Sequence, residues 1–331
     1  MPALIRAASR EYRSMSMDSH RWDGFQQRAG DIIIGTYPKC GTTWTQRIVD
    51  LLVFQTPDPR PATLTAPWLD SVMFSPIEED LARLKAQTHR RFVKTHLPLD
   101  AVPIWDDVFY IHVARDGRDT CMSFHNHQLH TKPEFRAHRM EDVMRHPKLM
   151  EAMLSARSGR TPATPPEDPR AFFHIWIGAA EAEVTEGYGI DLPFFEFETT
   201  YWRERARPNL LFVHYNDLKS DLASEMRRIA GYLGIDVPEA VMPSLVEAAG
   251  FDSMKRDAAT ILPGASDVWD GGADRFVFKG TNGRWRDVLT EGDLARYDTL
   301  VRRKWSPAQA AWVEGGRLAA GDPRTLSDSA V

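Results

Sequence analysis

The sequence has little cysteine, no long apolar run and no excess of basic residues, and each absence excludes a class of protein. Two cysteines in 331 residues, Cys40 and Cys121, cannot build a disulfide framework or a structural zinc site. The apolar runs span only a few residues, too few for a transmembrane helix, and the charged N-terminus is not a secretory signal. A formal net charge of −5 gives no overall positive field for nucleic acid. We therefore expect a reduced, cytoplasmic protein that binds neither nucleic acid nor a membrane.

What the sequence does contain is a regular alternation of buried strands and helices. Hydrophobic residues make up 43% of the chain, enough for a sizeable core. β-Branched and aromatic runs predict strands that can be buried on both faces, at residues 31–36, 91–96, 108–114 and 209–215. Strands alternating with helices favour a parallel sheet. We expect an α/β fold, a P-loop-like single domain with a central parallel sheet flanked by helices on both faces.

Composition also suggests where the domain begins and ends. We expect residues 1–29 to form a peripheral N-terminal segment, residues 30–314 the domain, and residues 315–331 a flexible tail. Residues 128–170 are rich in histidine, methionine, proline and charge. That composition predicts a mobile excursion near the ligand-binding site.

Residues 36–44 connect the first predicted strand to a helix and have the features of an anion-binding loop. The backbone N–H groups and the dipole of a helix N-terminus favour a phosphate-like anion, and Lys39 adds a positive charge. In a nucleoside triphosphate loop the lysine directly follows the second glycine. Here Thr42 follows Gly41, and the lysine precedes the glycine by two residues. The loop therefore predicts an anion site without the usual γ-phosphate and Mg²⁺.

Further charged groups follow the next two predicted strands. Lys94 and His96 end the second strand, and Arg115 follows the third. Ligands of open α/β sheets bind beyond the carboxyl ends of the strands, so we expect these residues to meet Lys39 there. An imidazole with a pKa near ~6.5 could accept a proton from a hydroxyl group.

Four ordered motifs resemble the cytosolic sulfotransferase family, in a bacterial-like form. Residues 36–44 (Thr-Tyr-Pro-Lys-Cys-Gly-Thr-Thr-Trp) resemble its 5′-phosphosulfate loop, and residues 94–98 (Lys-Thr-His-Leu-Pro) its catalytic-histidine segment. Residues 113–123 are similar to its 3′-phosphate segment, and residues 276–285 to its C-terminal nucleotide-clamping loop. The match spans about residues 30 to 300.

The resemblance implies transfer of a sulfuryl group from 3′-phosphoadenosine 5′-phosphosulfate (PAPS) to a hydroxyl or amine, leaving adenosine 3′,5′-bisphosphate (PAP). By analogy His96 is the general base, while Lys39 and Lys94 stabilise developing charge. No metal is required. The implied donor-binding residues are Lys39, Cys40, Gly41, Thr42, Thr43, Trp44, Arg115, Ser123, Tyr215, Phe251, Lys279 and Gly280.

Three positions depart from the family pattern. Cys40 stands where the family usually has serine, and a thiol is a weaker hydrogen-bond donor. A cysteine at a helix N-terminus can also have a lowered pKa and be oxidised, although an inert substitution is the favoured interpretation. Phe278 replaces an arginine, and Ala249 replaces a threonine near the adenine. Each of these two changes removes one expected contact to the nucleotide.

The acceptor is a small molecule that the sequence does not identify. Aromatic candidate wall residues favour a phenolic or other apolar acceptor; they are Phe74, Phe172, Phe173 and Trp176. The 260–275 loop is also expected to cover this pocket. His125, His127 and His130 invite a zinc interpretation, but a helix face or pocket rim is favoured because no cysteine or carboxylate spacing supports a metal.

Two other functions stay open at this point. One is a non-catalytic protein that binds the 3′-phosphonucleotide, and the other is a small-molecule kinase, which would need the missing lysine. The expected assembly is a monomer or a homodimer.

Overall fold

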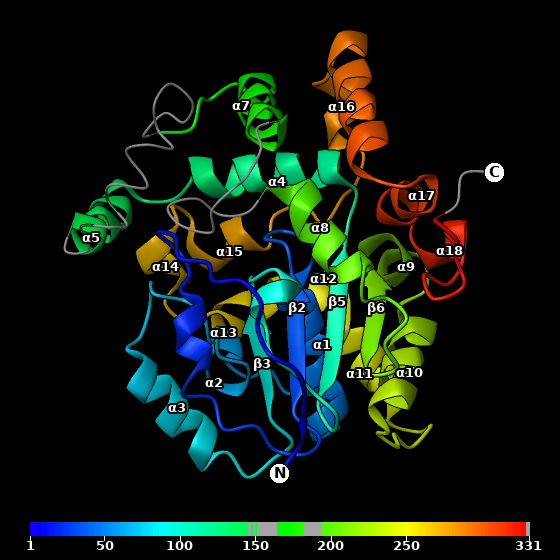
Figure 1. The fold of residues 1–331 in the computed structure, drawn as a ribbon. Helices are drawn as coiled ribbons and strands as arrows, with labels where there is room; N and C mark the ends of the chain where they lie inside the picture. Colours follow the sequence, from blue (N-terminus) through cyan, green and yellow to red (C-terminus); the bar gives the residue numbers. More distant parts are fainter. Residues whose placement is uncertain (145–146, 148–149, 151–163, 182–192, 329–331) are drawn as a thin grey trace.

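The centre of the molecule is a four-stranded parallel sheet with the order β3-β2-β5-β6. The computed structural model describes residues 1–144, 147, 150, 164–181 and 193–328. The four predicted strands are confirmed (Figure 1), as β2 (Ile32–Thr36), β3 (Phe92–Thr95), β5 (Phe109–Ala114) and β6 (Leu210–His214). Their carboxyl ends deliver the predicted site residues to one edge of the sheet.

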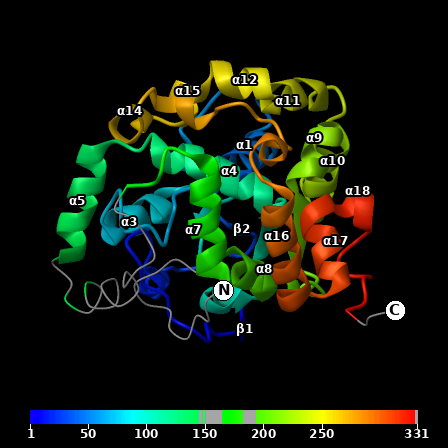
Figure 2. The same cartoon turned by 90° about the horizontal axis from the view of Figure 1, so that it is seen from above.

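Helices pack on both faces of this sheet, as expected (Figure 2). Successive side chains of a strand point to opposite faces, and in β2 Ile33 belongs to one core cluster while Ile32 and Ile34 belong to the other. The Ile32 face is covered by α1 (Thr42–Phe54), α10 (Leu222–Leu233) and α11 (Met242–Ala249). The Ile33 face is covered by α7 (Pro169–Glu181), α8 (Phe194–Trp202), α16 (Glu291–Lys304) and α17 (Pro307–Gly315).

Shorter elements surround this framework. A two-stranded antiparallel sheet, which the sequence patterns did not predict, pairs β1 (Leu4–Arg6) with β4 (Ile104–Trp105). The remaining described helices are α2 (Ala62–Thr65), α3 (Ile77–Ala86), α4 (Gly117–Leu129), α5 (Pro133–Met144), α9 (Tyr215–Ser220), α12 (Phe251–Arg256), α13 (Ala258–Ile261), α14 (Ala265–Val268), α15 (Gly272–Phe276) and α18 (Arg317–Ala320). Short 3₁₀ helices lie at η1 (Ser19–Trp22), η2 (Leu99–Ala101) and η3 (Arg284–Asp287).

Both chain ends are held more firmly than the sequence predicts. The N-terminal segment is not peripheral, because Tyr12, Trp22 and Phe25 are buried in the main core cluster. The predicted flexible tail is also anchored as far as Asp328, whose carboxylate accepts a hydrogen bond from Trp202 Nε1 at 2.8 Å. Of the predicted excursion, residues 145–146, 148–149 and 151–163 lie outside the described residues.

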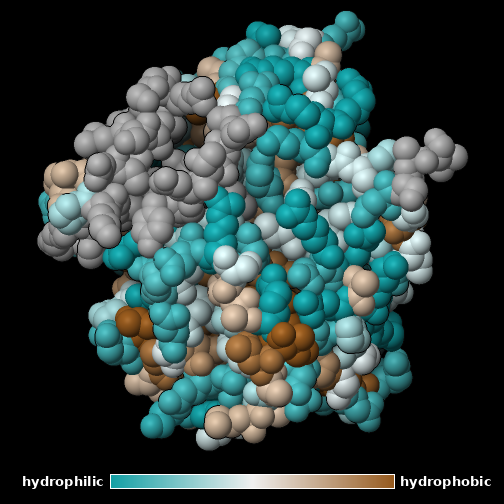
Figure 3. Space-filling view, viewed as in Figure 1, coloured by the Kyte–Doolittle hydropathy of each residue, from teal (hydrophilic) through white to brown (hydrophobic). Residues whose placement is uncertain are grey.

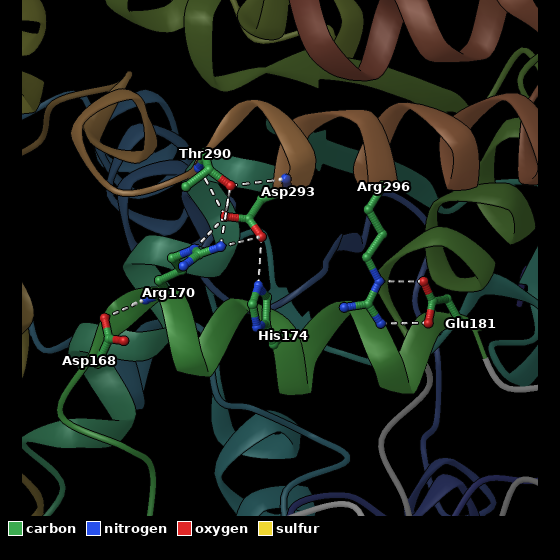
Figure 4. Close-up of polar contacts among 7 residues, drawn as sticks. All are labelled: Asp168, Arg170, His174, Glu181, Thr290, Asp293 and Arg296. Atoms are coloured by element: carbon green, nitrogen blue, oxygen red, sulfur yellow. Dashed lines mark hydrogen bonds and ion pairs between the residues drawn. The ribbon is translucent and has the colours of Figure 1, made fainter.

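Charged side chains join α7 to α16 above the sheet (Figure 4). Asp293 caps the start of α16 by accepting from the Thr290 N–H at 2.9 Å, and it also accepts from Arg170 and His174, each at 2.6 Å. One turn along, the Arg296 guanidinium makes two hydrogen bonds of 2.7 Å to the carboxylate of Glu181. Several charges in one network fix the relative position of two helices better than an isolated surface pair does.

None of the described helices combines the length and the apolar character needed to cross a bilayer. The face shown in Figure 3 is mostly hydrophilic, with apolar side chains gathered in its lower half.

Candidate active site

The loop between β2 and α1 holds an unusual backbone conformation. Lys39 has a φ of +75° and Gly41 a φ of +107°, both in the left-handed region. For a residue other than glycine this region costs ~1–3 kcal/mol, and such strain concentrates at functional sites. At Gly41 a Cβ atom would lie 3.0 Å from the Tyr215 ring, so glycine permits the close approach of that ring. The loop therefore brings Lys39 and the first N–H groups of α1 to one place.

Aromatic and hydroxyl side chains fix the start of α1. The hydroxyl oxygens of Thr36 and Thr42 lie 2.5 Å apart, which ties the end of β2 to the first residue of the helix. Trp44 Nε1 donates to the Ala249 carbonyl at 2.8 Å, and the Trp44 ring meets the Tyr215 ring edge to face at 5.3 Å. Position 249 therefore supplies a backbone oxygen that holds Trp44.

The side chain of Cys40 does not join this site. It is 0% exposed within the main core cluster, and its thiol lies 3.5 Å from the Thr120 hydroxyl. Burial raises the pKa of the Cys40 thiol, and a nearby carboxylate raises it further. A buried, protonated thiol does not react readily. The structure thus favours the inert interpretation of Cys40 and leaves only its backbone near the loop.

Arg115, directly after β5, connects the anion loop to the segment that precedes η3. Its guanidinium donates to the Lys39 carbonyl at 3.3 Å and to Asn282 Oδ1 at 2.8 Å, and it stacks 4.1 Å from the centre of the Tyr215 ring. Its Nε is buried without a hydrogen-bond partner. A buried donor of this kind is expected to have a partner, so it fits an anion such as phosphate.

Gly280, in the segment that precedes η3, lies against the ring of Phe251, the first residue of α12. Gly280 has a φ of +59°, and a Cβ there would lie 2.5 Å from the Phe251 ring. Lys219, which the sequence analysis did not single out, donates from Nζ to the Gly280 carbonyl at 2.5 Å. The glycine therefore lets the segment press against an aromatic ring that is itself 42% exposed.

His96 has a defined tautomer. Its Nδ1 lies 2.7 Å from the Thr36 carbonyl oxygen, which can only accept, so Nδ1 carries the hydrogen and Nε2 keeps its lone pair. The ring also meets the Trp68 ring edge to face at 4.8 Å. Burial and the charges of Lys94 and Lys39 hold the pKa of His96 well below its ordinary value. His96 is therefore neutral near pH 7, with Nε2 able to accept a proton.

Four cations meet around the anion loop, and we call Lys39, Lys94, Arg115 and Arg284 the cation cluster. Burial, together with the charges of Arg115, Lys94 and Arg284, lowers the pKa of Lys39 to about 7. Burial lowers the pKa of Lys94 to about 8, although Asp70 opposes the shift. Such repulsion is costly without a counter-charge. An anion bound among these groups would relieve it.

His127 brings a second imidazole to the site, from α4. Its Nδ1 lies 3.4 Å from Lys39 Nζ, and its ring centre lies 5.0 Å from that of Trp269. Burial and the nearby charge of Lys39 hold the pKa of His127 well below its ordinary value. When Lys39 is protonated it donates to Nδ1, which leaves the hydrogen of His127 on Nε2. His127 is then a hydrogen-bond donor, whereas His96 is an acceptor.

A single cavity of about 570 Å³ joins these groups, a size typical of small-molecule sites. Of the predicted donor-binding residues, all except Cys40 line it. His96 and Lys94 line it as well, beside an aromatic region of the cavity. The members of that region are Trp68, Phe74, Phe124, Trp269 and Phe276.

The predicted acceptor walls are only partly right. Phe74 lines the cavity, and Trp269 brings in the 260–275 loop as expected. The other three predicted walls do not line the cavity; they are Phe172, Phe173 and Trp176. All three are buried in the core on the inner side of α7, which packs against α8. The helical spacing of these three residues is the pattern of a helix face turned toward the core.

Two of the three neighbouring histidines, His125 and His127, have different surroundings. His125 Nε2 lies 2.8 Å from the Pro166 carbonyl, so it donates a structural hydrogen bond, whereas His127 lines the cavity. In the part of the chain that the structure describes, no three His, Cys, Asp or Glu side chains gather as metal ligands would. The sequence motifs did not identify Trp68 and Arg139, which lie in none of them, as lining residues, and Arg284, which lies within the 276–285 motif, was given no role there.

Comparisons with known proteins agree on one family. A model described as a sulfotransferase domain matches residues 29–308. The chain is 37% identical over 322 residues to a glycolipid sulfotransferase of Mycobacterium bovis, covering 92% of this chain and 94% of the relative. It is 27% identical over 316 residues to cytosolic sulfotransferase 1 of Danio rerio, covering 90% and 92% of the two chains.

Solved structures share the fold. Mouse sulfotransferase SULT7A1, complexed with PAP, superposes with a TM-score of 0.61 at 20% identity, covering 87% of this chain and 89% of the other. Retinol dehydratase, in complex with androsterone and the inactive cofactor PAP, gives a TM-score of 0.63 at 23% identity, covering 86% and 83%.

Proposed function

The chain belongs to the sulfotransferase family, and on that premise we propose that it transfers a sulfuryl group from PAPS to a hydroxyl group, with His96 as the general base. The observation that carries this proposal is the His96 ring itself. Its Nδ1 donates a hydrogen bond to the carbonyl oxygen of Thr36 at the end of β2. Nε2 therefore keeps its lone pair and can accept a proton beside the anion loop.

The cavity offers matching groups for each part of the donor. We assign the 5′-phosphosulfate to Lys39 and the N-terminus of α1, and the 3′-phosphate to Arg115, Ser123 and Lys279 with Gly280. The rings of Trp44, Tyr215 and Phe251 line the same cavity, the first two with their centres 5.3 Å apart, and suit an adenine base. The unpartnered Nε of Arg115 supports a phosphate at this place.

The proposed chemistry needs positioning and charge stabilisation more than a covalent intermediate. His96 Nε2 takes the acceptor hydroxyl proton as that oxygen forms a bond to sulfur. The bond from sulfur to the phosphate oxygen breaks, and its electron pair stays on PAP. Lys39 stabilises that oxygen, while Lys94 stabilises the sulfuryl oxygens. Because the donor's negative charge offsets both lysines, His96 becomes a stronger base once the donor is bound.

We propose that the acceptor hydroxyl lies on the polar head of an amphiphile such as a glycolipid. The mycobacterial relative is named a glycolipid sulfotransferase, and the acceptor half of the cavity suits a sugar. It combines the rings of Trp68 and Trp269 with the polar side chains of His127 and Gln128. Radiolabelled sulfate transfer to alkyl glucosides, phenols, alkyl alcohols and amines tests this choice, and a preference for the phenols would contradict it.

The first prediction tests the base. His96→Ala is expected to lower kcat by about 10²- to 10⁴-fold, because proton removal then depends on water. Binding of PAP, measured by calorimetry, is expected to stay within a fewfold of wild type. Unchanged transfer would refute His96 as the base and favour a non-catalytic role for it. Absence of PAP binding by the wild-type protein would refute the function as a whole.

Two broader properties belong to the same proposal. We place the enzyme in the cytoplasm, supported by two free and buried cysteines, and cell fractionation tests this. We propose that it is a monomer or a homodimer, which its mass by light scattering distinguishes.

A further inference from the structure

Arg284 is a half-buried cation that the assigned donor contacts do not use. It is the first residue of η3 and lines the main cavity. Its Nη2 donates to the Met122 carbonyl on α4 at 3.3 Å, one residue before Ser123. Its guanidinium lies 5.2 Å from the centre of the Phe278 ring. The side chain therefore ends between α4 and the segment that carries Lys279.

The charges around Arg284 are unbalanced. Burial lowers the pKa of Arg284, and the charge of Arg115 lowers it further. Burial also lowers the pKa of Lys39, to which Arg284 contributes, so these cations lie close enough to repel one another. Asp119 is the carboxylate that opposes this repulsion, and one of its oxygens already accepts the Gly283 N–H at 2.8 Å. Within the described residues, neither guanidinium forms an ion pair. Two guanidiniums held in this way are suited to a phosphate group.

Phe278 supplies no positive charge, so Arg284 can fill this role. The residue directly before Lys279 is aromatic and brings no charge to the anion, whereas Arg284 reaches the same ring from the other end of the segment. The neighbouring Arg286 shows the contrast within η3. It is exposed, stacks 4.5 Å from the Trp285 ring, and does not line the main cavity.

We propose that Arg284 is a ligand of the donor's 3′-phosphate, shared with Arg115 and Ser123, and that it takes the place of a cation at position 278. This inference rests on the proposed function, because it assumes that the 3′-phosphate of PAP occupies this end of the cavity. According to this inference, Arg284 makes the protein bind a 3′-phosphorylated nucleotide more tightly than adenosine 5′-monophosphate (AMP).

The second prediction measures that preference directly. Calorimetry gives the dissociation constants of PAP and AMP, and their ratio isolates the 3′-phosphate. Arg284→Ala is expected to reduce the wild-type preference for PAP by about 10- to 100-fold, the range for a lost charge-assisted hydrogen bond. Arg284→Met, which largely keeps the length of the side chain, should reduce the preference for PAP to a similar extent. Arg286→Ala should keep the wild-type ratio.

The outcomes separate this inference from the proposed function. If the wild type does not bind PAP, the proposed function fails. If the wild type prefers PAP and both Arg284 variants keep that preference, only the role of Arg284 is refuted. Equal weakening of PAP and AMP would place Arg284 elsewhere on the nucleotide and also refute the inference. The unfolding temperature of each variant identifies any that fail to fold.

Discussion

At the scale of single residues, Lys39 carries two costs at once. Its backbone lies at a positive φ, and its ammonium group is buried among like charges. Both features are unfavourable in a folded protein without a ligand. A bound anion offsets the second, so the free energy of ligand binding depends on the protonation of this one side chain.

The third prediction follows from the lowered pKa of Lys39, about 7. At pH 8 most Lys39 side chains are neutral, and a bound anion raises the pKa again, so binding of PAP should take up protons. The uptake is measured by calorimetry in buffers of different ionisation enthalpy. It should fall in Lys39→Arg, because arginine stays protonated throughout. Equal proton uptake by both proteins would contradict the assignment.

The same residues show what a sequence can and cannot reveal. Lys39 and Cys40 are adjacent, yet one lines the cavity and the other is buried in the core. A motif gives the residue types and their order, but the direction of each side chain depends on the φ and ψ angles of the loop. Arg284 lies within the 276–285 motif, but the motif did not show that its side chain lines the cavity, because this depends on how η3 packs against α4.

At the scale of elements, the segment that follows α15, up to Gly283, is held beside the main cavity by side-chain contacts rather than by regular secondary structure. Arg115 and Lys219 each donate to it, and Gly280 lies against Phe251. Its geometry therefore depends on a few positions.

The fourth prediction compares two glycines with similar backbone angles. Gly280→Ala should weaken PAP binding by about tenfold or more, because its Cβ would collide with the Phe251 ring, 2.5 Å away. Gly234→Ala is the matched control: Gly234 ends α10 at φ +64° with no atom near its Cβ. The control should lose ~1–2 kcal/mol of stability with PAP affinity unchanged. Similar affinity losses in both variants would indicate a general effect of backbone strain.

Element prediction succeeded where side chains follow a regular period. The four central strands are short and mostly apolar, with many β-branched and aromatic residues, which is the pattern of strands covered on both faces. The prediction of a peripheral N-terminal segment failed because the buried residues there are spaced by neither two nor 3.6 residues. They are Tyr12, Met17, Trp22 and Phe25. They are buried by tertiary packing, which local patterns do not encode.

At the scale of the whole molecule, an acidic protein encloses a cationic cavity. The chain carries a net charge of −5, yet four cations meet at one edge of the sheet. The overall charge did not indicate an anionic ligand. The parallel sheet, which the alternation of strands and helices predicts, brought Lys39, Lys94 and Arg115 together at the carboxyl ends of its strands. The acceptor could not be predicted, since its walls come from loops and helices.

The fifth prediction uses this contrast. Raising NaCl from about 50 to about 500 mM should weaken PAP binding severalfold, because the shorter Debye length screens the approach of the anion to the cavity. Adenosine, which has no phosphate, should bind with nearly unchanged affinity over the same range. Equal salt effects on the two ligands, measured by calorimetry, would show that the cation cluster does not govern binding.

Thr36 has a consequence for how such an enzyme could change over evolutionary time. Its carbonyl fixes the His96 tautomer and its hydroxyl holds Thr42, so one residue at the end of β2 positions both the proposed base and the first residue of α1. Two residues that line the cavity, Phe74 and Trp269, lie in segments outside the central sheet. If the proposed function holds, mutations at these two positions would alter acceptor choice without changing the contacts of Thr36 with His96 and Thr42. Descendants of one ancestral enzyme could therefore diversify in substrate while inheriting an unchanged reaction centre.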